Sequence, residues 1–384
     1  MEKRIIRYGM VGGHLNAFIG GVHRIAIGFD QSAELFAGCF SPIESENTET
    51  AERYYLDRSR VYKDYKEMAQ KESQRDDKID FVAIVTPNFM HYEVAKEFLL
   101  HGIHVMCEKP LCFEVDQALE LQALAKEKGL LFAVDYAYTG NAMIKLAKQF
   151  IADGEIGDIV GVSGEYLQEW LIDELGEQSD TIKLSGWRTN PKVAGISNCI
   201  GDIGTHIESM VHYITGLTVK RISAKLQTFG HPLELKADIL VDYDNGASGV
   251  YACSQVAIGH MNDLSVRIFG TKGSLEWKQE YPNDLRVTRK GQPPQLYSRG
   301  AGYVTGRAAA LNRLPSGHPE GYFEAIANIY KTFAGALAKK NAGIPLDADD
   351  LDFPRIESGI SGVRFIHAAV ESGKNDSRWV SVEP

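Results

Sequence analysis

The first 137 residues alternate between short apolar runs and segments with helical spacing, and this alternation restricts the fold more than any other feature. Residues 79–85 form a nearly continuous apolar run that ends at Thr86 and Pro87. Runs that are apolar on both faces are typical of parallel strands covered by helices. The sequence therefore predicts an α/β domain over residues 1–137, a doubly wound Rossmann sheet. Its expected strands are residues 5–11, 34–40, 79–85, 103–107 and 130–135.

The remaining residues, 138–384, have a different pattern. Strand-like runs follow one another without intervening helices, and Asp244-Asn245-Gly246 between two of them is a strong hairpin signal. We expect a second, α+β domain for substrate binding and oligomerisation, built on a large, mostly antiparallel open sheet. A stretch at residues 282–319, rich in Gly, Pro and Arg, is expected to be a loop. Expected helices cover residues 202–215, 322–340 and 354–372, and the last is placed to pack back on the first domain.

Charge and composition exclude several classes of protein. The formal net charge is -10 and basic residues form no long cluster, so we expect no nucleic-acid or membrane partner. The five cysteines are odd in number and form no C-x-x-C pair, which indicates free thiols in a reducing cytoplasm. The spacing of Cys107, Cys112 and His104 fits no common zinc pattern, so we expect no metal.

A glycine-rich turn follows the first predicted strand. A dinucleotide fingerprint requires small residues where the backbone approaches the pyrophosphate and where the helix packs on the strand. The register that fits is Gly12-x-His14-x-x-Ala17, in which His14 replaces the middle glycine, and Gly13 and Asn16 lie in the same loop. The position favours phosphate binding at a helix N-terminus. A turn without a ligand is the alternative, and His14 could contact the pyrophosphate or the substrate.

The end of the second predicted strand normally carries an acidic residue for the NAD ribose. Here it carries Ser41 and no acid, so Ser41 is the expected ribose contact. No Lys or Arg lies close enough in sequence to hold a 2′-phosphate, which Glu44 and Glu46 would repel. We therefore favour NAD over NADP.

Three polar residues point to chemistry. Lys109 follows a buried strand and precedes Pro110, which keeps it out of a helix. Asp202 and His206 are four residues apart in a predicted helix, so they share one face, and His is a natural base near neutral pH. A surface Lys paired with Glu108, and a helix-capping Asp beside a chance surface His, are the alternatives.

Together these segments resemble the Gfo/Idh/MocA family, which includes glucose–fructose oxidoreductase and inositol dehydrogenase. The most specific marks are Glu108-Lys109-Pro110 and the segment from Gly201 to His206. Thr86-Pro87-Asn88 with His91, Gly154-Glu155-Ile156-Gly157, and the segment from Gly270 to Leu275 support them. The sequence Gly186-Trp187-Arg188 is similar to the corresponding motif of family members that act on glycosides and anhydrosugars such as levoglucosan.

The resemblance implies hydride transfer between a nicotinamide and a CH–OH carbon of a sugar, glycoside, anhydrosugar or inositol. It makes Lys109 an electrostatic helper beside the nicotinamide, His206 the proton acceptor, and Asp202 a substrate ligand or support for His206. Tyr138, Trp187 and Arg188 are expected at the substrate, and the large sheet is expected to form a homodimer or homotetramer. The expected cofactor-binding residues are Gly12, Gly13, His14, Asn16, Ala17, Ser41, Thr86, Pro87, Asn88, His91, Glu108 and Lys109.

Three other functions fit the same residues. A lyase or glycosidase could recycle a bound NAD without net oxidation, and a sugar sensor could keep the fold without catalysis. An NADP-dependent reductase working in the opposite direction is the nearest alternative.

Overall fold

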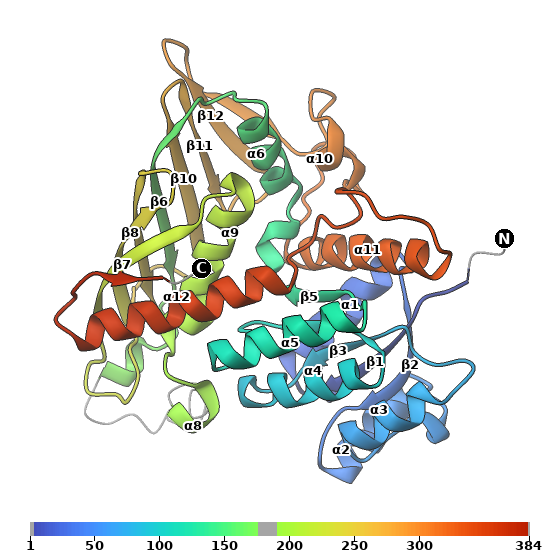
Figure 1. Ribbon diagram of the computed structural model, residues 1–384. Helices are drawn as coiled ribbons and strands as arrows, with labels where there is room; N and C mark the ends of the chain where they lie inside the picture. Colours follow the sequence, from blue (N-terminus) through green and yellow to red (C-terminus); the bar gives the residue numbers. More distant parts are fainter. Residues whose placement is uncertain (1–3, 176–189, 383–384) are drawn as a thin grey trace. The chain divides into compact units, whose positions relative to one another are not determined.

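The computed structural model describes residues 4–175 and 190–382, which fall into two compact units (Figure 1). Unit 1 is Met1–Gly140 with Tyr322–Ile360, and unit 2 is Asn141–Gly321 with Ser361–Pro384. The first change of unit lies close to the change of pattern in the sequence. The assignment of residues 322–360 differs from expectation. The sequence placed all of 138–384 in the second domain, but these residues belong to unit 1.

The sheet of unit 1 has five parallel strands in the order β2-β1-β3-β4-β5. The direction of strand addition reverses at β1, and ligands bind at such a switch point, outside the carboxyl ends of the strands. All five strands predicted from the sequence are present, and the Rossmann prediction is confirmed. The strands are β1 (Arg7–Gly12), β2 (Glu34–Cys39), β3 (Phe81–Val85), β4 (His104–Glu108) and β5 (Phe132–Asp135).

Helix α11 explains why residues 322–360 return to unit 1. It packs against α1, and its buried Tyr330 and Phe333 cover the sheet at Phe81. Burial of a large apolar side chain contributes about 1.5–3 kcal/mol, so this helix completes the core on one sheet face. The opposite face packs on α4. The helices of this unit are α1 (Phe18–Phe29), α2 (Glu44–Arg53), α3 (Tyr65–Ser73), α4 (His91–Leu100), α5 (Val115–Glu127) and α11 (Tyr322–Asn341), with short 3-10 turns at Arg58–Arg60, Asn88–Met90 and Ala137–Gly140.

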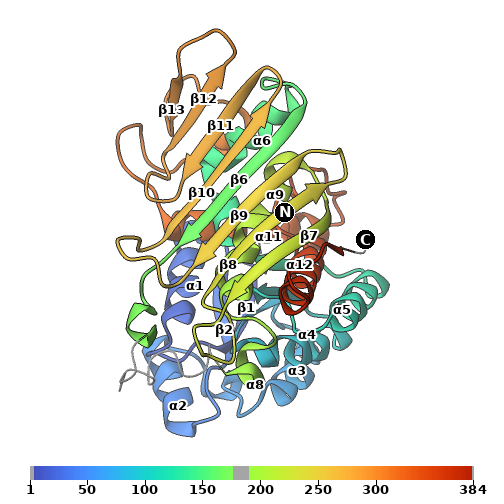
Figure 2. The ribbon, with the colours of Figure 1, turned by 90° about the vertical axis from the view of Figure 1, so that its left-hand side faces the viewer.

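Unit 2 contains the large open sheet that the sequence predicted (Figure 2). Its order is β13-β12-β11-β10-β6-β9-β8-β7-β14, and only the β6–β9 pair is parallel. Asp244-Asn245-Gly246 joins β8 to β9 as expected, with Gly246 at a φ of 87°. The strands are β6 (Ile159–Leu167), β7 (Val219–Gln227), β8 (Lys236–Tyr243), β9 (Ser248–Ser254), β10 (Asp263–Gly270), β11 (Gly273–Lys278), β12 (Asp284–Arg289), β13 (Gln295–Ser298) and β14 (Val380–Ser381).

The expectation of a loop at residues 282–319 is wrong in part, because β12, β13 and the short helix α10 (Gly306–Ala310) lie within it. Leu285 and Val287 alternate inward and extend the buried face of the sheet. The strands are short and bordered by Gly and Pro, so their alternation is weak in the sequence. Beyond β13, the Arg299 guanidinium and the Glu320 carboxylate form a buried ion pair at 2.9 Å.

Helices α6 and α9 cover one face of this sheet. Ile207 on α9 packs directly on Gly164 of β6, where a Cβ atom would collide with it. Within the described ranges, no helix is both long and apolar enough to span a membrane. The helices here are α6 (Ala142–Ala152), α8 (Pro191–Ala194), α9 (Thr205–Thr215) and α12 (Ile356–Lys374), with a 3-10 turn at Ile172–Leu175 and a π-helical turn at Ile200–Gly204. The last residues of unit 1 and the first of the second stretch of unit 2 are both in α12.

Candidate active site

The turn after β1 can hold a ligand close to its backbone. Gly12 and Gly13 have φ values of 83° and 73°, which favour glycine. A Cβ on Gly12 would lie 2.9 Å from the backbone of Val85 and Thr86, at the end of β3. The two glycines therefore let the turn lie against the neighbouring strand end, as the fingerprint prediction requires.

The third small residue of the fingerprint differs from expectation. Ala17 is the N-cap of α1, and its backbone N–H donates to the His14 carbonyl at 2.8 Å. The close approach of helix and turn is made by Gly20, because a Cβ there would collide with the Cα atom of Gly13. The loop is therefore three residues longer than the fingerprint register chosen from the sequence.

His14 and Asn16 occupy the extra length of this loop. Asn16 is exposed and His14 is partly buried. The His14 Nδ1 atom lies 3.9 Å from the Glu46 carboxylate. Arg24 of α1 stabilises the loop by donating a hydrogen bond to the Gly13 carbonyl.

An acidic group stands at the end of β2 after all. Ser41 is buried there, and its hydroxyl donates to Glu46 Oε2 at 2.6 Å. The Ser41 Oγ atom also accepts from the Ile43 N–H at 3.1 Å. Glu46 lies in the first turn of α2. Its carboxylate therefore reaches the end of β2, where the sequence itself has Ser41 and no acidic residue.

The end of β3 offers a polar group without a partner. Among the described residues, the buried Thr86 Oγ1 has no hydrogen-bond partner. Pro87 is exposed and Asn88 begins a short turn beside it. An unpaired buried hydroxyl beside the Gly12 turn fits a ligand that supplies hydrogen bonds, such as a nucleotide.

His91 has a different role from the one expected. It is fully buried, with Nδ1 2.7 Å from the Pro110 carbonyl oxygen and Nε2 2.9 Å from the Thr86 carbonyl oxygen. Burial lowers the pKa of His91 although both carbonyls act in the opposite direction, so the neutral ring donates to one carbonyl at a time. His91 therefore ties the β3 and β4 ends together rather than presenting a nitrogen to a cofactor.

Lys109 immediately follows the end of β4. Its side chain is partly buried, the peptide bond to Pro110 is cis, and its backbone N–H donates to Glu108 Oε2 at 3.0 Å. The Glu108 carboxylate is turned inward to His23 at 2.8 Å. Tyr138 lies in the turn after β5, is buried, and packs on Tyr322 with ring centroids 5.9 Å apart.

In unit 2, a hydrogen-bond chain holds Asp202. Its Oδ2 atom accepts from Gln255 Nε2 at 2.9 Å, and Gln255 Oε1 accepts from Asn198 Nδ2 at 2.7 Å. The buried Glu234 carboxylate fixes the preceding backbone by accepting from the N–H groups of Asn198 and Ile200 at 3.1 and 3.0 Å. Burial raises the pKa of Glu234 although these donors act in the opposite direction.

Asp202 lies in the π-helical turn that leads into α9. It does not cap a helix, which was the alternative role considered from the sequence. His206 is in the first turn of α9, is buried, and its ring centroid lies 6.0 Å from that of Tyr166 on β6. Trp187 and Arg188, expected at the substrate, lie outside the described residues.

Both halves of the chain match family models. The model for the NAD-binding Rossmann fold of the oxidoreductase family matches residues 6–136, and that for the GFO/IDH/MocA C-terminal domain matches residues 144–276. The chain belongs to the GFO/IDH/MocA family. The resemblance inferred from the sequence is confirmed, and the matching models describe an oxidoreductase family with an NAD-binding Rossmann fold.

Two similar proteins extend over nearly the full length of this family member, and a third over about half. The uncharacterized oxidoreductase YfiI of Bacillus subtilis is 36% identical, over 98% of this chain and 96% of that protein. An inositol dehydrogenase homolog from Azotobacter vinelandii is 34% identical in its complex with NADH and myo-inositol, with a TM-score of 0.89 and 98% of each chain covered. The levoglucosan dehydrogenase of Pseudarthrobacter phenanthrenivorans is 32% identical over 55% of this chain and 58% of that protein.

The residues of unit 1 fit NAD. The turn at Gly12 lies directly against the end of β3, where the Thr86 hydroxyl has no hydrogen-bond partner among the described residues, and Glu46 with Ser41 offers an acidic group for a ribose. Sequence reasoning missed Gly20, His23 and Gln255, and it considered Glu46 only as a repulsive charge. The glycine pair Gly20-Gly21 inside the first helix was the available signal for the helix contact.

Proposed function

We propose that this protein oxidises a secondary hydroxyl of a cyclic polyol or sugar with NAD+. The observation that carries the proposal is its full-length similarity to the inositol dehydrogenase homolog whose structure contains NADH and myo-inositol. The levoglucosan dehydrogenase similarity covers a little over half of the chain and supports the wider class of ring-shaped carbohydrates. Inositols are therefore the first substrates to test, and anhydrosugars the second.

The proposed roles of individual residues follow from the resemblance of the sequence to the family. Bound NAD+ supplies the hydride acceptor. Lys109 stabilises the negative charge that develops on the substrate oxygen, because an ammonium group lowers the energy of an alkoxide in a site with little water. His206 accepts the hydroxyl proton, and Asp202, held by Gln255, binds the substrate or orients His206.

The outer face of the unit 2 sheet is proposed to bind a second copy. The pairing register places Leu240 of β8, Val250 of β9 and Phe269 of β10 on the same face, and all three are exposed. Exposed apolar side chains grouped on a sheet mark an interaction surface. Light scattering of the wild-type protein and of Leu240→Asp tests this, since the proposal requires an oligomer that the variant weakens.

Formation of NADH with purified protein, NAD+ or NADP+, and a panel of myo-inositol, scyllo-inositol, levoglucosan and glucose tests the activity. We expect NADH formation with NAD+ and at least one ring-shaped polyol. Conversion of a sugar without net NADH, by protein that carries bound nucleotide, would instead support cofactor recycling. No turnover of any substrate together with tight sugar binding would support a sensor.

A further inference from the structure

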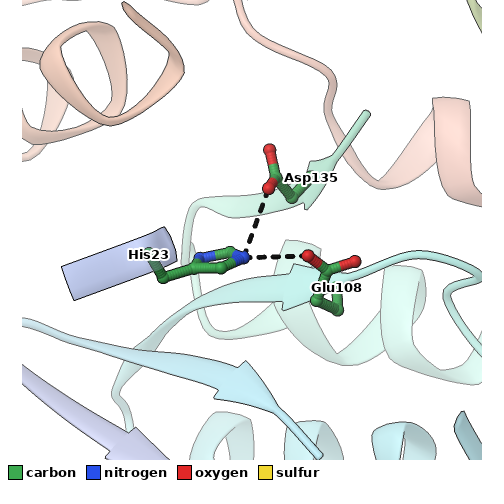
Figure 3. Close-up of side chains that lie close together, drawn as sticks. All are labelled: His23, Glu108 and Asp135. Carbon is green, nitrogen blue, oxygen red and sulfur yellow. Dashed lines mark hydrogen bonds and ion pairs between the residues drawn. The ribbon is translucent and has the colours of Figure 1, made fainter. Parts of the chain in front are cut away.

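Three ionisable side chains meet inside unit 1 at the carboxyl ends of β4 and β5 (Figure 3). Glu108 and Asp135 are the last residues of these strands and lie opposite each other in the pairing register. His23 reaches them from α1, with Nε2 2.8 Å from Glu108 Oε1 and 3.3 Å from Asp135 Oδ2. The side chains of His23 and Asp135 are each 1% exposed, so water screens this cluster very little.

The charges of the cluster depend on one another. Two adjacent buried carboxylates repel, and a cation between them removes that cost. Burial would lower the pKa of His23, but the hydrogen bond to Glu108 and the charge of Asp135 outweigh it and raise the pKa. Burial would likewise raise the pKa of Glu108, but His23 holds it below its usual range. The contacts of the cluster therefore favour a protonated His23 beside an ionised Glu108.

Asp135 titrates differently from Glu108. Burial raises its pKa to about 7, with His23 opposing and Glu108 reinforcing the change. Apart from the ion pair with His23, neither of its buried oxygens has a hydrogen-bond partner among the described residues. Asp135 therefore acts mainly through its charge on His23.

The His23 ring is fixed at both nitrogens. Its Nδ1 atom lies 2.6 Å from the Tyr330 hydroxyl oxygen, and the two rings pack edge to face with centroids 5.7 Å apart. An imidazolium carries hydrogen on both nitrogens, so it donates to Tyr330 through Nδ1 and to Glu108 through Nε2. Burial raises the pKa of Tyr330 well above its usual value, so it stays a neutral phenol.

Glu108 links this buried cation to Lys109. One carboxylate oxygen accepts from His23 and the other accepts from the Lys109 backbone N–H. Both oxygens are thus used, which fixes the carboxylate and the first residue beyond the strand. The Lys109 ammonium also lowers the pKa of Glu108 and of Asp135. Lys109, like His23, therefore favours the ionised forms of both carboxyl groups.

Other charges act on the cluster from neighbouring elements. Arg24, one residue after His23 on α1, opposes its protonation. His91 at the start of α4 would favour the charged form of Glu108 only when protonated, and burial disfavours that state. Tyr8 of β1 acts on Tyr330, as do Glu108 and Asp135. None of these groups replaces the hydrogen bond from His23 to Glu108.

We propose that His23 is a positioning residue for Lys109, and that its imidazolium holds Glu108 against the Lys109 backbone with Asp135 as the second counter-charge. This inference rests on the proposed role of Lys109 in hydride transfer. A metal ion on the same three residues would require the Nε2 lone pair, whereas the proposed imidazolium carries a proton there, so the two assignments exclude each other. In this proposal His23 Nε2 therefore carries a proton rather than binding a metal.

The variant His23→Gln tests the proposal because the amide can still donate to Glu108 but carries no charge. His104→Gln is the matched control, since His104 is also buried, begins the same strand β4, and burial lowers its pKa to about 4, so it is neutral. With myo-inositol and NAD+, we expect kcat of His23→Gln to fall about tenfold and KM for NAD+ to change less than about twofold. Its substrate deuterium isotope effect should rise, because hydride transfer becomes slower.

The pH profile separates positioning from general damage. Without the His23 charge, the pKa of Glu108 rises. The fall of kcat on the acidic side of its pH profile, the acidic limb, should therefore move toward higher pH by roughly one unit. Asp135→Asn removes a like charge beside Glu108 and should not move that limb upward. His104→Gln should leave the limb in place even if it lowers stability.

Two measurements do not require a substrate. Nitrogen NMR of ¹⁵N-histidine-labelled full-length protein should show one histidine, absent in His23→Gln, that keeps both ring protons to higher pH than a free imidazole does. Hydrogen exchange of the Lys109 amide should be faster in His23→Gln than in wild type or His104→Gln. A neutral His23 at pH 7, an unchanged Lys109 amide, or a stoichiometric metal lost in His23→Gln would each overturn the proposal. Wild-type protein that fails to oxidise any polyol would contradict the proposed function and leave these two measurements decisive for His23.

Discussion

The Ser41 hydroxyl donates to the Glu46 carboxylate across 2.6 Å, so a residue from the first turn of α2 supplies the acid that the end of β2 lacks. A carboxylate there accepts hydrogen bonds from a free ribose and repels a 2′-phosphate. Glu46→Gln should therefore raise kcat/KM for NADP+ relative to NAD+ by about tenfold, or about 1.4 kcal/mol. Glu49→Gln, exposed on the same helix, is the control. An unchanged cofactor ratio in Glu46→Gln would exclude this role.

Lys109→Ala and His206→Ala should each lower kcat at least about a hundredfold, because they remove charge stabilisation and proton transfer respectively. Steady-state NADH formation measures the effect, and fluorescence titration with NADH checks that the cofactor still binds. Lys126→Ala is the control, since Lys126 is exposed on α5 of the same unit. Near-normal turnover of either variant would refute the assigned role.

Gln255→Leu should lower kcat/KM about tenfold, since Asp202 loses the amide that orients it. Gln255→Glu should be worse, because it places a second carboxylate within hydrogen-bond distance of Asp202 and favours protonation of the pair. Kinetics of the two variants, with circular dichroism to verify folding, make the comparison. Wild-type activity in both variants would mean that Asp202 does not depend on Gln255.

Gly20→Ala and Gly21→Ala form a matched pair on α1. A methyl group at residue 20 collides with the Gly13 backbone, whereas nothing lies within 4 Å of one at residue 21. Gly20→Ala should lower the free energy of unfolding by about 1–3 kcal/mol and weaken NAD binding. Gly21→Ala should raise it by about 0.5–1 kcal/mol through helix propensity. Urea unfolding with and without NAD measures both effects, and similar values for the two variants would contradict the close contact.

His104 should make stability depend on pH. Burial lowers its pKa to about 4 in the folded protein, below the ordinary value of 6.5. The unfolded chain therefore binds a proton that the folded protein excludes, and stability present above pH 6.5 is lost as pH falls toward 4. The contribution lost between pH 7 and pH 5 is about 2 kcal/mol. His104→Gln should flatten this part of the urea-unfolding profile, whereas His260→Gln, partly exposed, should not.

The sequence predicted the parallel sheet well because its central strands β3 and β4, and the edge strand β5, are continuous buried runs with clear ends. It also placed Gly12, Thr86 and Lys109 at strand ends, since that follows from topology alone. Strands β12 and β13, at one end of the large sheet, were missed because they are short and bordered by turn residues.

The supporting contacts could not be predicted in the same way. His23 looks like one polar residue on an apolar helix, and its importance depends on Glu108 and Asp135, which are far away in sequence. Gln255 is likewise one of several polar residues at the end of a strand until the fold brings it to Asp202. The π-helical turn at Ile200–Gly204 has no signature in the apolar spacing, which fits an ordinary helix.

The return of α11 to unit 1 has a consequence for how the chain is made. The His23 partner Tyr330 and the apolar side chains that cover Phe81 are synthesised almost two hundred residues after the parallel strands are complete. A ribosome-bound chain that ends before α11 therefore exposes one face of this sheet to water. All of Asn141–Gly321 leaves the ribosome during that interval, so this first stretch of unit 2 can begin to fold before the core of unit 1 is complete. Chaperones that shield apolar surfaces would then act on the part of the molecule that binds NAD.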